Sequence, residues 1–260
     1  MSGWAKAFVA AMRLGAAGLA DLFLPDVCAA CGAEDAAEAG LCATCNVKLL
    51  SLVSLPYCPR CGATIGPNIP IYEDGCAACD TTLPRFARVV RLGPYGDPLR
   101  GIVRDLKYRR WGGLCGRLGR LLAEAVAATC RDESFDLAMP VPMHWRRRLS
   151  RGHDHARLLG RAVADKLDLP LGNELIRVRH TPPQVGLPRS QRAQNVRGAF
   201  AVSHRAAIEG AKILLVDDVT TTGATANEAT RALLAAGALR VVLAVVTKTE
   251  PPTAYAQHWA

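Results

Sequence analysis

Eight of the ten cysteines in the chain fall into four C-x-x-C pairs. The pairs are Cys28/Cys31, Cys42/Cys45, Cys58/Cys61 and Cys76/Cys79. Two residues between thiolates let a tight turn present both sulfur atoms to one ion, and four thiolates complete the tetrahedral shell of Zn²⁺. Gly32 and Gly62 each follow the second cysteine of a pair, where a zinc knuckle often needs a positive φ. The spacing therefore predicts two structural zinc sites, each closed by four thiolates.

The pattern leaves two ways to distribute the pairs between the ions. A sequential arrangement uses the first two pairs for one ion and the last two for the other, whereas a cross-braced arrangement interleaves them. The intervals between Cys31 and Cys42 and between Cys61 and Cys76 suit short hairpins, which favours the sequential arrangement. Cys115 and Cys130 lie outside the pattern, and we expect them to be ordinary thiols.

A second group of residues that could do chemistry follows the apolar run ILLV. It consists of Asp217, Asp218, Val219, Thr220, Thr221, Thr222, Gly223, Ala224 and Thr225. Threonines and a glycine that open a helix offer hydroxyls and backbone N–H groups to a phosphate. Two acids at the end of a buried strand need polar partners, and the vicinal hydroxyls of a ribose are suitable donors. The loop therefore predicts a ribose phosphate ligand, and the alternative is an N-capping threonine run with solvated acids.

Strands and helices that would position this loop alternate after residue 84. The pattern predicts strands over residues 86–92, 135–141, 175–179, 212–219 and 241–247, and helices over residues 98–108, 114–130, 153–167 and 224–236. Near-continuous apolar strands indicate an α/β fold with a mostly parallel sheet that has helices on both faces. Ligands in such sheets bind at the carboxyl ends of the strands.

The composition of the whole chain limits its class and its partners. Half of the 260 residues are hydrophobic, which is typical of a globular protein, and the formal net charge of +9 favours anionic partners. No uncharged segment reaches the roughly 18 residues of a membrane span, so we expect a cytoplasmic protein without an integral membrane segment. We expect an amphipathic helix over residues 1–24, a double zinc ribbon over 25–84, the α/β domain over 85–250 and a tail over 251–260.

The stretch LLVDDVTTTGAT, over residues 214–225, resembles the PRPP-binding motif of type I phosphoribosyltransferases. With the four cysteine pairs, the LKY element at 106–108, the PVPMH element at 140–144 and the segment 184–200, nearly the whole chain resembles the ComF family. The resemblance implies a phosphoribosyltransferase-like fold with a flexible loop and a small hood. It also implies an association with competence and the uptake of single-stranded DNA.

The resemblance further implies roles for individual residues. Asp217 and Asp218 would hold the ribose 2′- and 3′-hydroxyls, directly or through Mg²⁺. The 5′-phosphate would lie against the loop residues Thr220, Thr221, Thr222, Gly223, Ala224 and Thr225. Val141 and Pro142 would form the pyrophosphate loop. Residues 184–197 would form a lid. If the chain is an enzyme, our own candidates for stabilising the charge of the leaving group are Lys107, Arg189 and Arg192.

One stretch departs from the pattern of the family. Relatives often show Arg-Gly-Phe-Asn-Gln where this chain has Arg-Gly-His-Asp-His over residues 151–155. His153 and His155 are two residues apart on the predicted helix and would point in different directions. We therefore expect both to be helix-surface histidines.

Three functional hypotheses follow. The first is an enzyme, a glycosyltransferase of the phosphoribosyltransferase type, that displaces pyrophosphate from PRPP with a nitrogen nucleophile. The second is an accessory protein without turnover that senses PRPP or handles single-stranded DNA together with DNA-uptake proteins. The third treats the zinc ribbons as a protein-docking module that the α/β domain switches.

Overall fold

The computed structural model describes residues 27–34, 40–66, 84–108, 112–146, 153–182 and 187–250, together with positions 70, 72, 75, 76, 79 and 149. The predicted helix over residues 1–24 and the tail over 251–260 lie outside the described residues.

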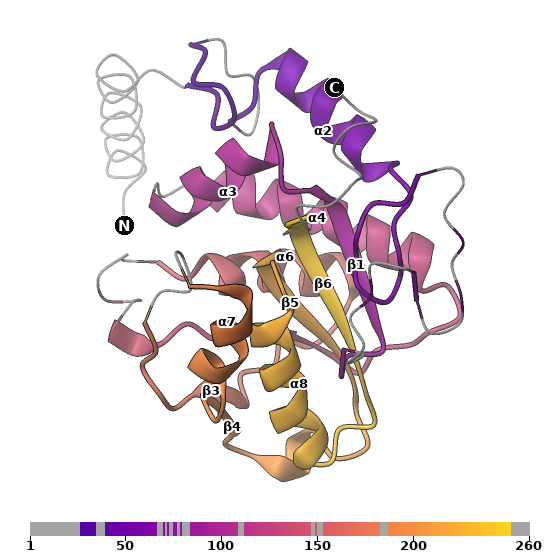
Figure 1. Ribbon diagram of the computed structural model, residues 1–260, viewed down its shortest axis with the longest axis vertical. Helices are drawn as coiled ribbons and strands as arrows, with labels where there is room; N and C mark the ends of the chain where they lie inside the picture. Colours follow the sequence, from indigo (N-terminus) through magenta and orange to yellow (C-terminus); the bar gives the residue numbers. More distant parts are fainter. Residues whose placement is uncertain are drawn as a thin grey trace, which may run out of the picture.

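Four parallel strands form the main sheet in the order β1-β6-β5-β2 (Figure 1). They are β1 (Arg88–Pro94), β2 (Leu137–Pro140), β5 (Lys212–Thr220) and β6 (Arg240–Lys248). β5 and β6 occupy the centre, and nearly all of their residues are buried or half-buried, as their apolar runs predict. The predicted α/β fold with a mostly parallel sheet is confirmed.

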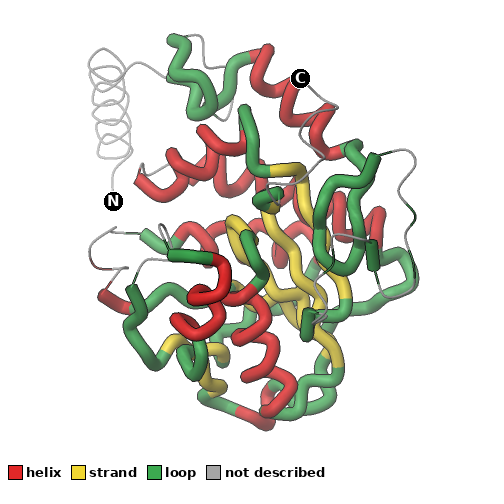
Figure 2. Tube along the Cα trace, viewed as in Figure 1, coloured by secondary structure: helices red, strands yellow, loops and turns green. Residues whose placement is uncertain are grey.

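Helices cover both faces of this sheet (Figures 1 and 2). One face carries α3 (Leu99–Tyr108), α4 (Gly112–Thr129) and α6 (His155–Leu167), and the other carries α7 (Arg189–Val196), α8 (Ala224–Ala235) and the antiparallel pair β3 (Leu175–Arg177) and β4 (Phe200–Val202). The alternation of side chains along β5 divides the core in two. Leu214 and Val216 pack against α4 and α6, whereas Ile213 and Leu215 pack on the side of α8.

Two helices lie where the sequence pattern predicted none. α2 (Ala43–Val53) begins directly after Cys42, whose sulfur accepts a hydrogen bond from the Cys45 backbone N–H at 3.5 Å and caps the helix. The second cysteine pair thus lies at the N-cap and on the first turn of a helix, whereas the expected hairpin between Cys31 and Cys42 runs through residues 35–39, which lie outside the described residues. α7 lies inside the predicted lid segment, where eight residues form a helix whose Val196 is buried.

The first cysteine cluster and α2 belong to the main hydrophobic core. Leu41 and Leu49 are buried in the same cluster of side chains as Leu92 and Leu99. Gly101 on α3 approaches this region so closely that a Cβ atom there would collide with the carbonyl of Ala30. This part of the zinc-binding region therefore packs as an extension of the sheet domain.

The second cysteine cluster covers the open edge of β1. The Val89 N–H donates to the Pro59 carbonyl at 2.8 Å, which continues the hydrogen bonding of the strand into the zinc-binding region. The Arg60 guanidinium donates to the carbonyls of Pro84 at 3.1 Å and Phe86 at 3.0 Å. These contacts cover part of an edge that would otherwise be free to pair with another chain.

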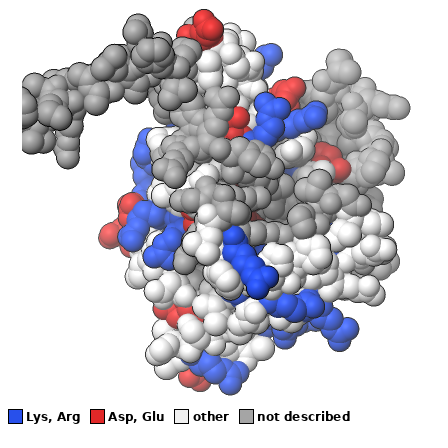
Figure 3. All heavy atoms as spheres, turned by 90° about the vertical axis from the view of Figure 1, so that its left-hand side faces the viewer, with Lys and Arg blue, Asp and Glu red and all other residues white. Residues whose placement is uncertain are grey.

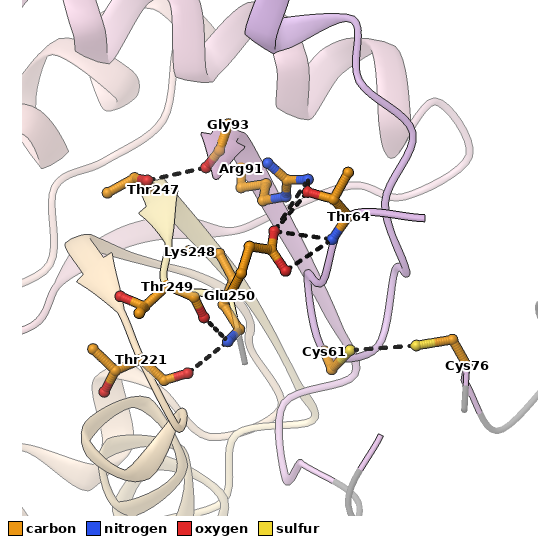
Figure 4. A network of polar contacts seen from close by, with 10 residues as sticks. All are labelled: Cys61, Thr64, Cys76, Arg91, Gly93, Thr221, Thr247, Lys248, Thr249 and Glu250. Carbon is orange, nitrogen blue, oxygen red and sulfur yellow. Dashed lines mark hydrogen bonds and ion pairs between the residues drawn. The ribbon is translucent and has the colours of Figure 1, made fainter. Parts of the chain in front are cut away.

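A buried arginine anchors the second cluster to the sheet (Figure 4). Arg91 of β1 is 1% exposed, and its Nη2 donates to the Thr64 hydroxyl at 2.8 Å and lies 4.0 Å from a carboxylate oxygen of Glu250. Glu250 accepts from the N–H and the hydroxyl of Thr64, and the Tyr57 ring centroid lies 4.8 Å from the guanidinium carbon. Burial lowers the pKa of Arg91 to about 10, although the negative charge of Glu250 acts to raise it. Arg91 therefore connects β1 both to Thr64 beside the second cysteine cluster and to Glu250, which follows β6.

We expect Thr64→Val to lower the free energy of unfolding by about 2 kcal/mol, because it removes a hydroxyl that serves both Arg91 and Glu250. Urea denaturation of the zinc-loaded protein measures this change. Ser134→Ala, at an exposed position, serves as the control. An unchanged midpoint for Thr64→Val would show that the contact contributes nothing to stability.

Candidate functional site

The predicted phosphate loop joins the end of β5 to the start of α8. β5 continues through Thr220, and Gly223 then adopts a φ of +77°, a left-handed conformation that favours glycine, directly before the first residue of α8. The Thr222 hydroxyl accepts a hydrogen bond from the Ala224 N–H at 3.4 Å. The N-terminus of α8 therefore meets the loop, where the helix dipole favours an anion.

The two acids of the loop lie on opposite faces of the sheet. Asp218 is 6% exposed and follows Leu214 and Val216 toward α4 and α6, whereas Asp217 is half-buried and lies on the side of α8. Burial raises the pKa of the Cys115 thiol on α4 to about 11, and the charge of Asp218 adds to this shift. The more exposed Asp217 is thus the acid with readier access to a ligand.

Lys248, at the end of β6, contacts the backbone of the predicted phosphate loop. Its Nζ donates to the carbonyls of Thr221 at 2.6 Å and Thr249 at 2.7 Å, and the residue is 9% exposed (Figure 4). The aliphatic part of the side chain passes close to Gly62 beside the second cysteine cluster. The sequence analysis missed this residue, although a lysine that ends a buried apolar strand at the ligand edge was a signal for it.

The predicted pyrophosphate loop lies beside the phosphate loop. Val141 follows β2 and donates its N–H to the Val216 carbonyl at 2.8 Å, so β2 and β5 end at the same edge. The buried His144 ring, farther along this loop, lies 4.9 Å between centroids from His180, which precedes the lid segment. The structure therefore brings Val141 and Pro142 to the edge that carries Asp217.

Basic residues predicted for the leaving group are described only in part. Arg192 on α7 donates from Nε to the Leu187 carbonyl at 3.1 Å, and Asn195 donates to the Pro182 carbonyl at 3.1 Å. Both contacts stay within the lid segment and its flank. The side chains of Lys107 and Arg189 lie outside the described part of the chain, although their backbones belong to α3 and α7.

The prediction that His153 and His155 lie on a helix surface is wrong for His155. α6 begins at His155, and Asp154 caps it by accepting a hydrogen bond from the Arg157 N–H at 3.1 Å. His155 is 4% exposed, and its Nε2 lies 3.2 Å from Oδ2 of Asp218. His153 precedes the cap, and its Nε2 lies 2.8 Å from the Leu106 carbonyl, so the helical spacing used in the prediction does not apply.

The eight paired cysteines form two groups of four. One contains Cys28, Cys31, Cys42 and Cys45 and the other Cys58, Cys61, Cys76 and Cys79, and within each group the sulfur atoms lie within 4.8 Å of one another. The sequential arrangement is therefore confirmed. Three of the sulfur pairs are separated by 3.7–3.8 Å, which fits the separation of about 3.8 Å across a tetrahedral Zn²⁺ with bonds of about 2.3 Å.

The two knuckles share one backbone geometry. Gly32 and Gly62 have φ values of +79° and +77°, and their N–H groups donate to the carbonyls of Cys28 and Cys58 at 2.7 and 2.8 Å. The positive φ predicted at both glycines is confirmed. Four thiolates close each shell, so these sites fit structural zinc.

A hollow of about 470 Å³ lies away from all of these residues. Asp136 and Ala211 line it and directly precede β2 and β5, so it lies at the amino ends of the strands. Parallel sheets of this kind bind ligands at the opposite edge, and we assign the hollow no role in the site. Among the described residues, none of the helices has the length and apolar character needed to span a membrane.

We expect the purified chain to hold two zinc ions and Cys58→Ser to hold one, because three thiolates leave the second shell open while the first stays closed. Metal analysis after gel filtration measures the ratio. Cys130→Ser, which changes a buried cysteine outside both groups, should retain two ions. Two ions in Cys58→Ser would contradict the assignment of the second group.

Comparisons with known proteins agree with this organisation. Residues 19–81 match the family model of the double zinc ribbon domain, and residues 154–257 match that of the phosphoribosyl transferase domain. Competence protein F of Haemophilus influenzae is 33% identical over 202 residues, which cover 76% of this chain and 85% of that protein. DNA utilization protein YhgH of Salmonella typhi is 32% identical over 215 residues, 81% of this chain and 91% of that protein.

A more distant relative carries a related name. Competence protein ComFC of Bacillus subtilis is 27% identical over 203 residues, which cover 76% of this chain and 79% of that protein. Two closed cysteine groups, a parallel sheet with its acidic loop, and similarity over most of the length to competence protein F together place this chain in the ComF family.

Proposed function

We propose that the chain binds PRPP, or a related ribose 5-phosphate, with Mg²⁺ and transfers its phosphoribosyl group to a nitrogen acceptor with release of pyrophosphate. The junction of β5 and α8 carries this proposal. It combines an accessible acid, three threonines, a glycine in the left-handed conformation and a helix N-terminus at the ligand edge of a parallel sheet.

The loop after β5 would hold the 5′-phosphate. Its threonine hydroxyls and the first backbone N–H groups of α8 are donors, and the dipole of α8 favours the charge. Lys248 fixes the Thr221 carbonyl with its Nζ, so one side of the loop is already in place before a ligand arrives. Such preorganisation lowers the cost of ordering the loop on binding.

Asp217 and Asp218 would hold the ribose hydroxyls, directly or through Mg²⁺. Carboxylate oxygens are suitable ligands for Mg²⁺, which usually retains several waters and binds substrate phosphates as well. The lower burial of Asp217 supports a direct contact from this acid, and the buried Asp218 would then act from behind the loop. The ion would neutralise charge on the pyrophosphate group.

The reaction would be a displacement at the anomeric carbon. The bond from that carbon to a pyrophosphate oxygen breaks, a bond to the acceptor nitrogen forms, and the nitrogen loses a proton. The loop at Val141 and Pro142 would carry the pyrophosphate, and Lys107, Arg189 and Arg192 would stabilise its charge. The protein would contribute positioning and electrostatic stabilisation.

We expect Asp217→Asn to weaken the binding of PRPP in Mg²⁺ by at least about tenfold, because the amide loses the charge that attracts hydroxyl donors and the ion. Calorimetry measures the affinity. Asp165→Asn on α6, a position with a 65% exposed side chain, should bind like the wild type. A folded, zinc-loaded wild type that fails to bind would overturn the proposed function.

The names of two relatives, which mention competence and DNA utilization, support a second candidate that acts on DNA. We take its activity to be the binding of single-stranded DNA without turnover. The net charge of +9 suits an anionic polymer, and Trp145 is 55% exposed with the Arg146 guanidinium 5.3 Å from its ring centroid. Among the described residues on the face shown in Figure 3, basic side chains lie in several groups with acidic and uncharged surface between them.

If the second candidate is correct, Trp145→Ala should weaken the affinity for a short single-stranded oligonucleotide about tenfold, since stacking on a base is lost. Fluorescence anisotropy at fixed salt measures this affinity with and without PRPP. Leu149→Ala, at another exposed apolar position, is the control. Binding that is unaffected by Trp145→Ala would rule out stacking on this residue.

A further inference from the structure

His155 places an imidazole ring directly against the buried acid of the phosphate loop. Nε2 of His155 lies 3.2 Å from Oδ2 of Asp218, and the two side chains are 5% and 8% exposed. The other oxygen of the carboxylate, Oδ1, accepts the Val219 N–H at 2.8 Å. The carboxylate thus has the strand backbone at one oxygen and an imidazole nitrogen at the other.

The position of the ring is fixed by the start of α6. Asp154 caps the helix through the Arg157 N–H, so His155 is its first residue. Leu159 and Val163 of the same helix pack in the core with Leu214 and Val216 of β5. Because α6 follows β2, it begins at the carboxyl edge of the sheet, where its dipole also favours a negative charge at Asp218.

Two further side chains that could carry a proton lie near this pair. Cys115 on α4 lies close enough to Asp218 for its charge to raise the thiol pKa. The His153 ring lies 6.3 Å between centroids from His155. Within the described residues Nδ1 of His155 is buried and has no hydrogen-bond partner, so the observed polar contact of the ring is the one to Asp218.

We propose that His155 is a positioning residue, which holds the Asp218 carboxylate and thereby the end of β5 in the arrangement that receives the ribose phosphate. This proposal rests on the proposed function of the loop. Asp218 lies two residues before Thr220 on the same strand, so a shift of its carboxylate moves the backbone that leads into the phosphate loop. His155 itself would touch no ligand atom.

Three substitutions separate this role from simple packing. His155→Gln can place an amide N–H near the position of Nε2, and His155→Asn can place one near the position of Nδ1. His155→Leu keeps an apolar side chain without a donor. If His155 only fills space, the three variants should differ in stability, but their affinity for PRPP should not depend on whether the new side chain places an N–H donor near Asp218.

The experiment is calorimetry with PRPP in Mg²⁺ on the zinc-loaded full chain, with urea denaturation in parallel. We expect His155→Leu and His155→Asn to weaken affinity about tenfold and His155→Gln to stay within about threefold of the wild type. In an Asp218→Asn background, His155→Leu should cause little further loss, because the partner is already altered. If His155→Leu does not fold, the comparison of Gln with Asn still decides.

The outcomes distinguish the two proposals. A wild type that does not bind PRPP overturns the proposed function, and the positioning role with it. A wild type that binds, with equal affinity in all three variants or with Gln as weak as Asn, overturns the role of His155 alone. Losses that multiply in the double variant would also overturn it, because they would show that His155 and Asp218 act independently.

Discussion

The parallel pairing of β5 with β6 is the contact on which both the ligand edge and the attachment of the zinc ribbons depend. Thr220 lies beside Lys248 in this register, so the pairing brings the phosphate loop next to the end of β6. Lys248 then holds the Thr221 carbonyl, and Glu250 holds Thr64 of the second ribbon. One strand end therefore contacts the candidate site on one side and the metal-binding region on the other.

The parts that could be predicted from the sequence are those that a local pattern determines. The buried runs of β5 and β6 and the periodicity of α8 leave little freedom in type or position, and the zinc ligands follow from a spacing of two residues. His155 and Lys248 could not be placed in this way, because their contacts depend on how α6 and β6 pack. The prediction for His155 failed at the start of the helix. It began α6 two residues too early and therefore placed on the surface a ring that is buried.

The two halves of the double zinc ribbon are attached by different physical means. Leu41 and Leu49 bury apolar surface in the main core, whereas the second half depends on the buried charge of Arg91 and on the covered edge of β1. Removal of the ribbons would thus expose apolar residues on one side and the uncovered edge of β1 on the other. This argues against a detachable head that serves only to dock partners.

The position of β1 in the sheet constrains the order in which the chain can fold during its synthesis. Within the main sheet β1 pairs with β6, which leaves the ribosome after every other described strand. The knuckles can capture their metal while the chain is still growing, but β1 lacks its neighbour in the sheet until residues 240–248 emerge, and Thr64 lacks the Glu250 carboxylate. Early metal binding would then keep the first part of the chain compact until β6 has been synthesised and can pair with β1.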